Sequence, residues 1–312
     1  MNEQPTDSII QALIKDRKRD RFWRNIRFGT GLLVLLIFTL CLVGIVAAGN
    51  NDEDHVDRNK PYVNVVKLEG EVATEAPFSA QRTIPQIQKA FKDKKAHAVI
   101  LLIDSPGGSP VNASQIYHEI LRQKKGHPKI PVIAIGQDML TSAAYLVAAA
   151  ADFIYVDDNT ITGSIGVISS GFGFNNAISK VGIERRVFSS GAHKGRLDPF
   201  KPLETIDQEK MQKTLRTVHD NFINYVKATR SKKLNGSDDE IFSGDFWTGK
   251  EALKLGLVDG IADLEDILEK FHVDQYQCYS PKQSFLRQIL HDVGEETQLR
   301  LQNSHNRLQA KF

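Results

Sequence analysis

A serine between a β-type run and an alanine-rich run could act as a nucleophile. The apolar run 131–135 ends at Gly136, and Ser142 directly precedes the alanine-rich run 143–151. At the start of a helix, a serine meets unpaired backbone N–H groups and the positive end of the helix dipole, and both favour developing negative charge. A serine that only caps the helix fits the same pattern. The residue alone therefore leaves both interpretations open.

A nucleophilic serine needs a base that takes its proton and donors that bind the oxyanion. The nine histidines are scattered along the chain and form no evident His–Asp motif beside Ser142, whereas Lys194 lies among small residues in 189–195. A lysine acts as a base only when it is neutral, which requires burial to lower its pKa from about 10.4. A solvated loop lysine is the alternative interpretation of Lys194.

Gly107 and Gly108 could supply oxyanion donors, because they follow the apolar run 99–103 and no Cβ blocks the approach of a ligand to their N–H groups. A plain Pro-Gly-Gly turn is the alternative. Ser164, within the run 162–166, could hydrogen-bond an amine or could be an ordinary turn serine.

Strand-like and helix-like runs alternate around these residues. We expect strands over 62–68, 99–103, 132–135, 153–156 and 163–168. We expect helices over 79–92, from about 110 to 122, over 143–151, over 207–230 with Thr205 and Gln208 as a capping box, and a short one ending at Leu255-Gly256. This alternation predicts an α/β fold with right-handed crossovers.

The N-terminal region predicts a membrane anchor. Residues 1–27 become strongly basic, and residues 28–49 contain no charge. About 20 apolar residues span a bilayer, whereas the apolar core of a secretory signal, the alternative, has only about 7–15. We expect a cytoplasmic leader over 1–27, a transmembrane anchor over 28–49 and a linker over 50–60. Positive charge before the span and acidic residues after it place the rest of the chain outside the cytoplasmic membrane.

Composition is that of a globular protein, with 41% hydrophobic residues, 25% charged residues and a net charge of +2. The near-neutral balance predicts no nucleic-acid partner. Cys41 and Cys278 lie far apart, so neither a disulfide framework nor a metal cluster is expected.

Five motifs follow one another along the chain and together resemble one family. They are Asp104-Ser105-Pro106-Gly107-Gly108, Thr141-Ser142-Ala143-Ala144-Tyr145, Thr162-Gly163-Ser164-Ile165-Gly166-Val167, Ser190-Gly191-Ala192-His193-Lys194 and Gly256-Leu257-Val258-Asp259. In this order they resemble the signal peptide peptidase A family, in particular its half-length, SohB-type members. The resemblance covers about residues 60–270.

The resemblance implies a ClpP/crotonase-like α/β fold and a serine peptidase domain over 61–270 with a Ser142–Lys194 dyad. It offers least for residues 271–312, which we expect to be a polar tail. It also implies that Ser164 positions the lysine amine. Backbone N–H groups at Gly107, Gly108 and Ala143 would bind the oxyanion, and no metal or cofactor would take part. The implied substrates are remnant signal peptides and other apolar peptides at the membrane.

The resemblance also implies an assembly. Double-length relatives take the lysine from one half and the serine from the other, so a half-length chain would build each site from two protomers of a ring-shaped homo-oligomer. A crotonase-type acyl-CoA enzyme and a non-catalytic membrane scaffold are the alternative functions.

Overall fold

The computed structural model describes residues 17, 21–23, 25–41 and 56–280. The chain divides into two units, one made of residues 1–53 and 285–312 and the other of residues 54–284. In the first unit, a helix over Arg21–Cys41 is long and apolar enough to cross a membrane, judged by length and composition. This helix fits the expected anchor, of which residues 42–49 lie outside the described residues. The expected tail from residue 281 onward also lies outside them.

The second unit contains one eight-stranded sheet whose main path runs β6-β5-β3-β2-β1-β8, with β4 and β7 branching from β3. Its strands are β1 (Val63–Glu69), β2 (Val99–Ser105), β3 (Val132–Thr141), β4 (Phe153–Val156), β5 (Ile161–Gly163), β6 (Phe246–Trp247), β7 (Gly260–Ile261) and β8 (Tyr276–Tyr279). All pairs are parallel except β5 with β6.

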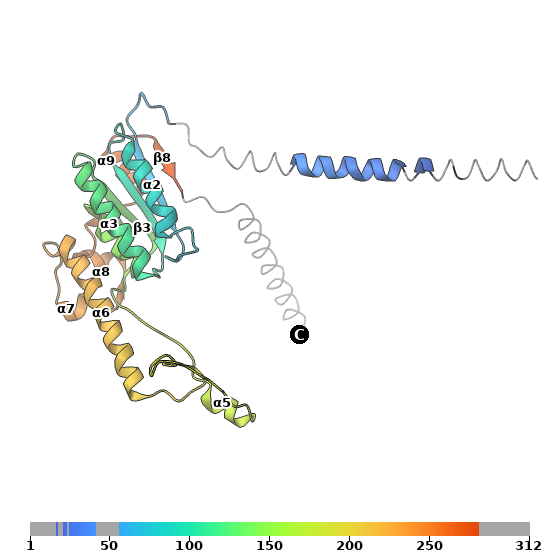
Figure 1. Cartoon of the computed structure of the whole chain (residues 1–312). Coiled ribbons are helices and arrows are strands. Elements are labelled where there is room, and N and C mark those ends of the chain that lie inside the picture. The colour runs from blue at the N-terminus through green and yellow to red at the C-terminus, as the bar shows by residue number, and fades with distance from the viewer. Residues whose placement is uncertain (1–16, 18–20, 24, 42–55, 281–312) are drawn as a thin grey trace, which may run out of the picture. The chain divides into compact units, whose positions relative to one another are not determined.

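Helices cover both faces of this sheet. The helices described in this unit are α2 (Ala80–Lys92), α3 (Pro110–Gly126), α4 (Ala143–Ala149), α5 (Asn175–Lys180), α6 (Thr205–Arg230), α7 (Asp238–Ile241), α8 (Gly249–Lys254) and α9 (Leu264–Lys270). Alternate β2 residues belong to two cores: Leu101 packs with α2, α3 and α4, and Ile100 packs with α9. Figure 1 shows α2 and α3 side by side over the sheet. The expected α/β class is confirmed.

Strand β3 changes partners along its length, and this change leads to Ser142. Its first half, Ile133–Gly136, pairs with β4, and its last residues, Met139–Thr141, pair with β5. Against β2, Gly136 pairs with Ile103 and Leu140 with Ser105, so four steps of β3 oppose two steps of β2. The two extra residues form a bulge that redirects the end of β3.

Three sequence expectations need correction. Strand β5 ends at Gly163, so the strand expected over 163–168 is wrong; beyond Gly163 the chain turns, with φ 50° at Ser164. The capping box on Thr205 and Gln208 is wrong, because α6 begins at Thr205 and Glu204 is its N-cap without a side-chain bond. The sheet also continues beyond residue 270, since β8 pairs with β1.

A buried ion pair joins α6 to the segment before β7. Arg230, whose side chain is 1% exposed, places Nη1 2.8 Å from Oδ2 of Asp259 and donates through Nη2 to the carbonyl oxygen of Gly256. Lys233 Nζ lies 2.7 Å from the other oxygen of Asp259. Burial alone would raise the pKa of the Asp259 carboxyl, but hydrogen bonds from Arg230 and Lys233 hold that pKa below its ordinary value.

Asp259→Asn should destabilise the fold, because it leaves the buried Arg230 guanidinium without its counter-charge. We expect the free energy of unfolding at pH 7 to fall by about 3 kcal/mol, measured by urea titration of the full chain in detergent. Asp274→Asn is the control, because the wild-type Asp274 carboxylate is exposed and lies 3.9 Å from Lys60 Nζ. This variant should change the free energy of unfolding little.

Asp259→Asn also tests how the free energy of unfolding depends on pH. A lowered pKa in the folded state stabilises the fold above the ordinary carboxyl pKa of about 4, and that contribution is lost as the pH falls through the folded-state pKa. The wild-type chain should therefore lose its advantage over Asp259→Asn in acid. Equal stability of the two chains at pH 7 would contradict this role of Asp259.

Candidate active site

Ser142 has an unusual backbone at the junction of β3 and α4. It is the N-cap residue of α4, with φ 53° and ψ −123°, and its side chain makes no capping hydrogen bond. A serine seldom adopts positive φ, and such strain concentrates at functional sites. Ser142 thus occupies the N-cap position, but its side chain does not cap the helix. The half-buried hydroxyl has no hydrogen-bond partner among the described residues.

Gly107 packs directly against this serine. A Cβ added at Gly107, where φ is 100°, would lie 2.7 Å from Cβ of Ser142 and 3.0 Å from the nitrogen of Ala143. Only glycine allows this approach at this backbone angle. The loop is also tied to Val72, whose N–H donates to the carbonyl oxygen of Gly107 at 2.7 Å.

The expected oxyanion donors differ in their availability. The N–H of Gly107 donates to the hydroxyl of Ser105 at 3.1 Å, so it is already engaged. Within the part of the chain that the structure describes, the N–H of Gly108 has no acceptor. Ala143 is the first residue of α4, where the N–H has no intrahelical partner. Of the three expected donors, the N–H groups of Gly108 and Ala143 are therefore the ones left unengaged among the described residues.

The segment that follows β5 lies against the serine from the other side. The N–H of Ser142 donates to the carbonyl oxygen of Gly163 at 2.8 Å. Ser164 follows with φ 50°, and its N–H donates to the carbonyl oxygen of Asp245 at 2.7 Å. A Cβ added at Gly163 would lie 2.5 Å from the ring of Trp247, so this turn also has no spare room.

Lys194 lies elsewhere, in an arm that we define as residues 167–204. The lysine is exposed, and its side chain makes no hydrogen bond or ion pair with any described residue. Arg185 and Asp198 form an ion pair within the arm, with 3.2 Å between Nε and Oδ2. Figure 1 shows α5 well away from the strands, near one end of α6. The structure therefore brings Ser142, Ser164, Gly107, Gly108 and Ala143 together, but not Lys194.

The arm also exposes many apolar side chains. They are Ile168, Phe172, Phe174, Val181, Ile183, Val187, Phe188, Leu197 and Leu203, and Phe188 is 95% exposed. Soluble monomers rarely expose an apolar set of this size. The arm is therefore a candidate interaction surface.

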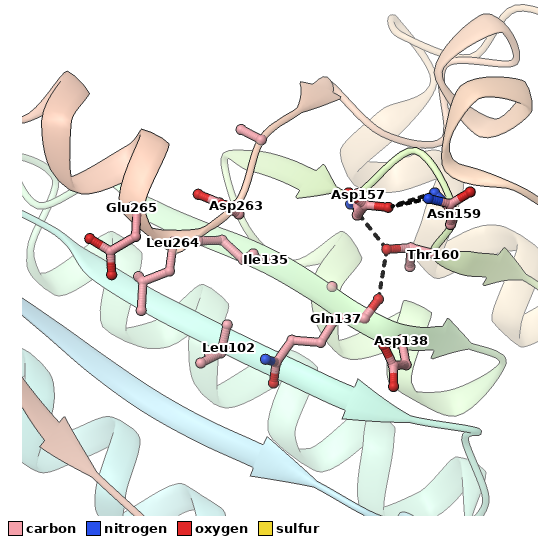
Figure 2. Close-up of a pocket in the computed structure, with 12 residues that line it drawn as sticks. Leu102, Ile135, Gln137, Asp138, Asp157, Asn159, Thr160, Asp263, Leu264 and Glu265 are labelled. Atoms are coloured by element: carbon pink, nitrogen blue, oxygen red, sulfur yellow. Dashed lines mark hydrogen bonds between the residues drawn. The ribbon is translucent and has the colours of Figure 1, made fainter.

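A cavity of about 500 Å³ lies at the bulge of β3, under the start of α9 (Figure 2). The hydroxyl of Thr160 donates to the carbonyl oxygen of Gln137 at 2.6 Å on one side of it. Asp138, Asp263 and Glu265 also line it, and neither Ser142 nor Lys194 does. Across the described residues, no three His, Cys, Asp or Glu side chains are grouped to hold a metal ion.

Two contributors to the site were not expected from the sequence. Ser105 engages the N–H of Gly107, and its place in the motif 104–108 was the available signal. Asp245 fixes Ser164 through its backbone carbonyl, which no side-chain pattern reveals.

The family described as "Peptidase family S49" matches residues 124–276. A putative signal peptide peptidase SppA of Enterococcus faecium is 28% identical over 277 residues, which are 80% of this chain and 79% of the relative. A putative protease of Synechocystis sp. is 30% identical over 201 residues, or 64% of this chain and 70% of the relative.

A Brucella abortus protein named Na(+)/H(+) antiporter NhaA is 38% identical over 242 residues, which are 75% of this chain. These residues make up 33% of the relative, so the chain spans a third of that protein's length. A solved structure of a mutant 1510-N membrane-bound stomatin-specific protease is 19% identical, covers 72% of this chain and 99% of its own, and has a TM-score of 0.46.

Gly107→Ala should disturb Ser142, because the Cβ of the new alanine would lie 2.7 Å from the Cβ of the serine. The alanine would also be strained at the φ of 100° that Gly107 adopts. We expect a fluorophosphonate to label Ser142 about 10- to 100-fold more slowly, equivalent to about 1–3 kcal/mol of strain. Gly126→Ala, where no atom lies within 4 Å of the added Cβ, is the matched control. Equal labelling of Gly107→Ala and wild type would show that this contact does not position the serine.

Proposed function

This chain belongs to peptidase family S49, the family of signal peptide peptidase A, and on that premise we propose that it is a serine endopeptidase in which Ser142 is the nucleophile. Family membership confirms the resemblance to signal peptide peptidase A, and the mixed α/β sheet fits the ClpP/crotonase-like fold that this resemblance implies. The crotonase-type acyl-CoA alternative loses its support, because the chain matches peptidases.

The backbone of Ser142 is the observation that carries this proposal. Its φ is positive, its side chain makes no capping hydrogen bond, and its hydroxyl remains unengaged, as do the N–H groups of Gly108 and Ala143 among the described residues. Two such donors would bind the oxyanion of a tetrahedral intermediate, and their positions are set before substrate arrives. The hydroxyl would attack the scissile carbonyl, and the C–N bond would break to release the protonated amine of the C-terminal fragment and leave an acyl-enzyme. Water would then hydrolyse this ester and free the N-terminal fragment and Ser142.

Lys194 is the proposed general base, and we place it in a neighbouring protomer. Its neutral amine would accept the proton of the serine hydroxyl, and Ser164 would orient that amine. Lys194 of one chain makes no contact with Ser142 of the same chain, and the arm that carries it exposes apolar side chains. A head-to-tail contact of this kind produces a ring when its rotation closes, and we propose such a ring.

The proposed substrates are apolar peptides at the membrane, including remnant signal peptides. The residues around Ser142 are small or apolar, as Ala143, Ala144 and Leu140 illustrate, and such surroundings suit aliphatic side chains. The helix over Arg21–Cys41 would hold the enzyme at the cytoplasmic membrane. Basic residues before it would keep the N-terminus in the cytoplasm, with the peptidase domain on the outer side.

Two substitutions test the catalytic roles directly. Ser142→Ala should lower the turnover of an apolar fluorogenic peptide by about 10⁴- to 10⁶-fold, because it removes the nucleophile. Lys194→Arg should be inactive as well, because a guanidinium does not give up its proton. Lys201→Arg, in the same arm, is the matched control and should retain activity.

Turnover is measured on the full chain in detergent, together with fluorophosphonate labelling. Near-normal activity of Ser142→Ala would exclude this nucleophile, and near-normal activity of Lys194→Arg would exclude this base. A wild-type chain with neither labelling nor turnover would favour the non-catalytic scaffold.

A further inference from the structure

His219 reaches the turn beside Ser142 from helix α6. Its Nε2 lies 2.9 Å from the carbonyl oxygen of Ile165, and the imidazole is half-buried. A carbonyl oxygen only accepts, so Nε2 carries the proton and donates.

The turn that His219 contacts, residues 163–166, also holds the serine. Its first residue accepts the N–H of Ser142, and Ser164 donates to the carbonyl oxygen of Asp245. A Cβ added at Gly166 would lie 2.8 Å from Cα of Gly244, so the end of the turn is closely packed as well. The turn is therefore held by two contacts: the hydrogen bond from His219 of α6 to Ile165, and the hydrogen bond from Ser164 to the carbonyl oxygen of Asp245.

Helix α6 links this turn to the arm. In the first turn of α6, Asp207 Oδ1 lies 2.8 Å from Nε of Arg196, two residues beyond Lys194. At the other end of α6, Arg230 forms the buried ion pair with Asp259. His219 lies between these two attachments. Through His219, helix α6, which follows the arm that carries Lys194, contacts the turn 163–166, which is bonded to Ser142.

We propose that His219 is a positioning residue that holds the turn 163–166, and through it Ser142 and Ser164, in the reactive arrangement. This inference rests on the proposed peptidase function. His219 does not touch the reacting atoms; it acts through the carbonyl of Ile165. Loss of its hydrogen bond should therefore slow the chemical step more than it weakens substrate binding.

A pair of variants of similar size separates the hydrogen bond from packing. His219→Leu removes the donor, and His219→Gln keeps an N–H donor on a side chain of comparable length. We expect His219→Leu to lower kcat and the rate of fluorophosphonate labelling about 10-fold, with KM and the thermal midpoint close to wild type. His219→Gln should retain rates within about 3-fold of wild type. His118→Ala, which removes an imidazole packed against Tyr225 of α6, is the matched control and should leave kcat unchanged.

Amide hydrogen exchange of the full chain in detergent supplies a readout that does not require activity. The N–H of Ser142, bonded to Gly163, should exchange faster in His219→Leu than in wild type and His219→Gln. Equal exchange in all three chains would overturn the proposal, as would equal loss of kcat in the Leu and Gln variants. If a fluorophosphonate does not label the wild-type chain but the three chains show the expected exchange pattern, the peptidase function is rejected and the positioning contact remains supported.

Discussion

The hydrogen bond from the N–H of Ser142 to the carbonyl oxygen of Gly163 is the contact on which the site depends. It is 2.8 Å long and joins the end of β3 to the end of β5 at the residue where the chain enters α4. Gly107 presses on the same serine from the other side. A serine held from two sides can keep a positive φ, because surrounding structure compensates for its strain. The same arrangement leaves its hydroxyl without a partner among the described residues.

The sheet and its helices position the two segments that the bond between Ser142 and Gly163 joins. The bulge in β3 lies between its first half, which pairs with β4, and its last residues, which pair with β5, so β5 is the strand that reaches the serine. Helix α4 is buried along its length, and Tyr145 in its first turn donates its hydroxyl to the carbonyl oxygen of Leu257 at 2.7 Å. Burial raises the pKa of that phenol, so it remains a neutral donor. The carbonyl it bonds lies two residues before Asp259, the partner of Arg230.

Much of the fold could be predicted from the sequence, because buried parallel strands are continuous apolar runs. The runs 99–103 and 132–135 fall within β2 and β3, and the glycines and small residues mark the strand ends beside the site. The sequence could not reveal that β5 stops at Gly163, since its length depends on pairing with the end of β3. It also could not reveal that the N–H of Gly107 is engaged by Ser105, because hydrogen-bond direction follows from the folded turn. The positions of Ser142 and Lys194 in the sequence made them candidates, the family resemblance implied their roles, and those roles remain predictions.

The separation of Lys194 from Ser142 makes assembly the central claim of this account. The most direct test co-assembles Ser142→Ala chains with Lys194→Ala chains and measures peptide turnover. If each site takes its serine from one protomer and its lysine from the next, a random equal mixture should contain intact pairs at about a quarter of its sites. Activity should therefore reappear in the mixture, although each variant alone is inactive. A co-assembled mixture that stays fully inactive would contradict the shared site and place each dyad within one chain.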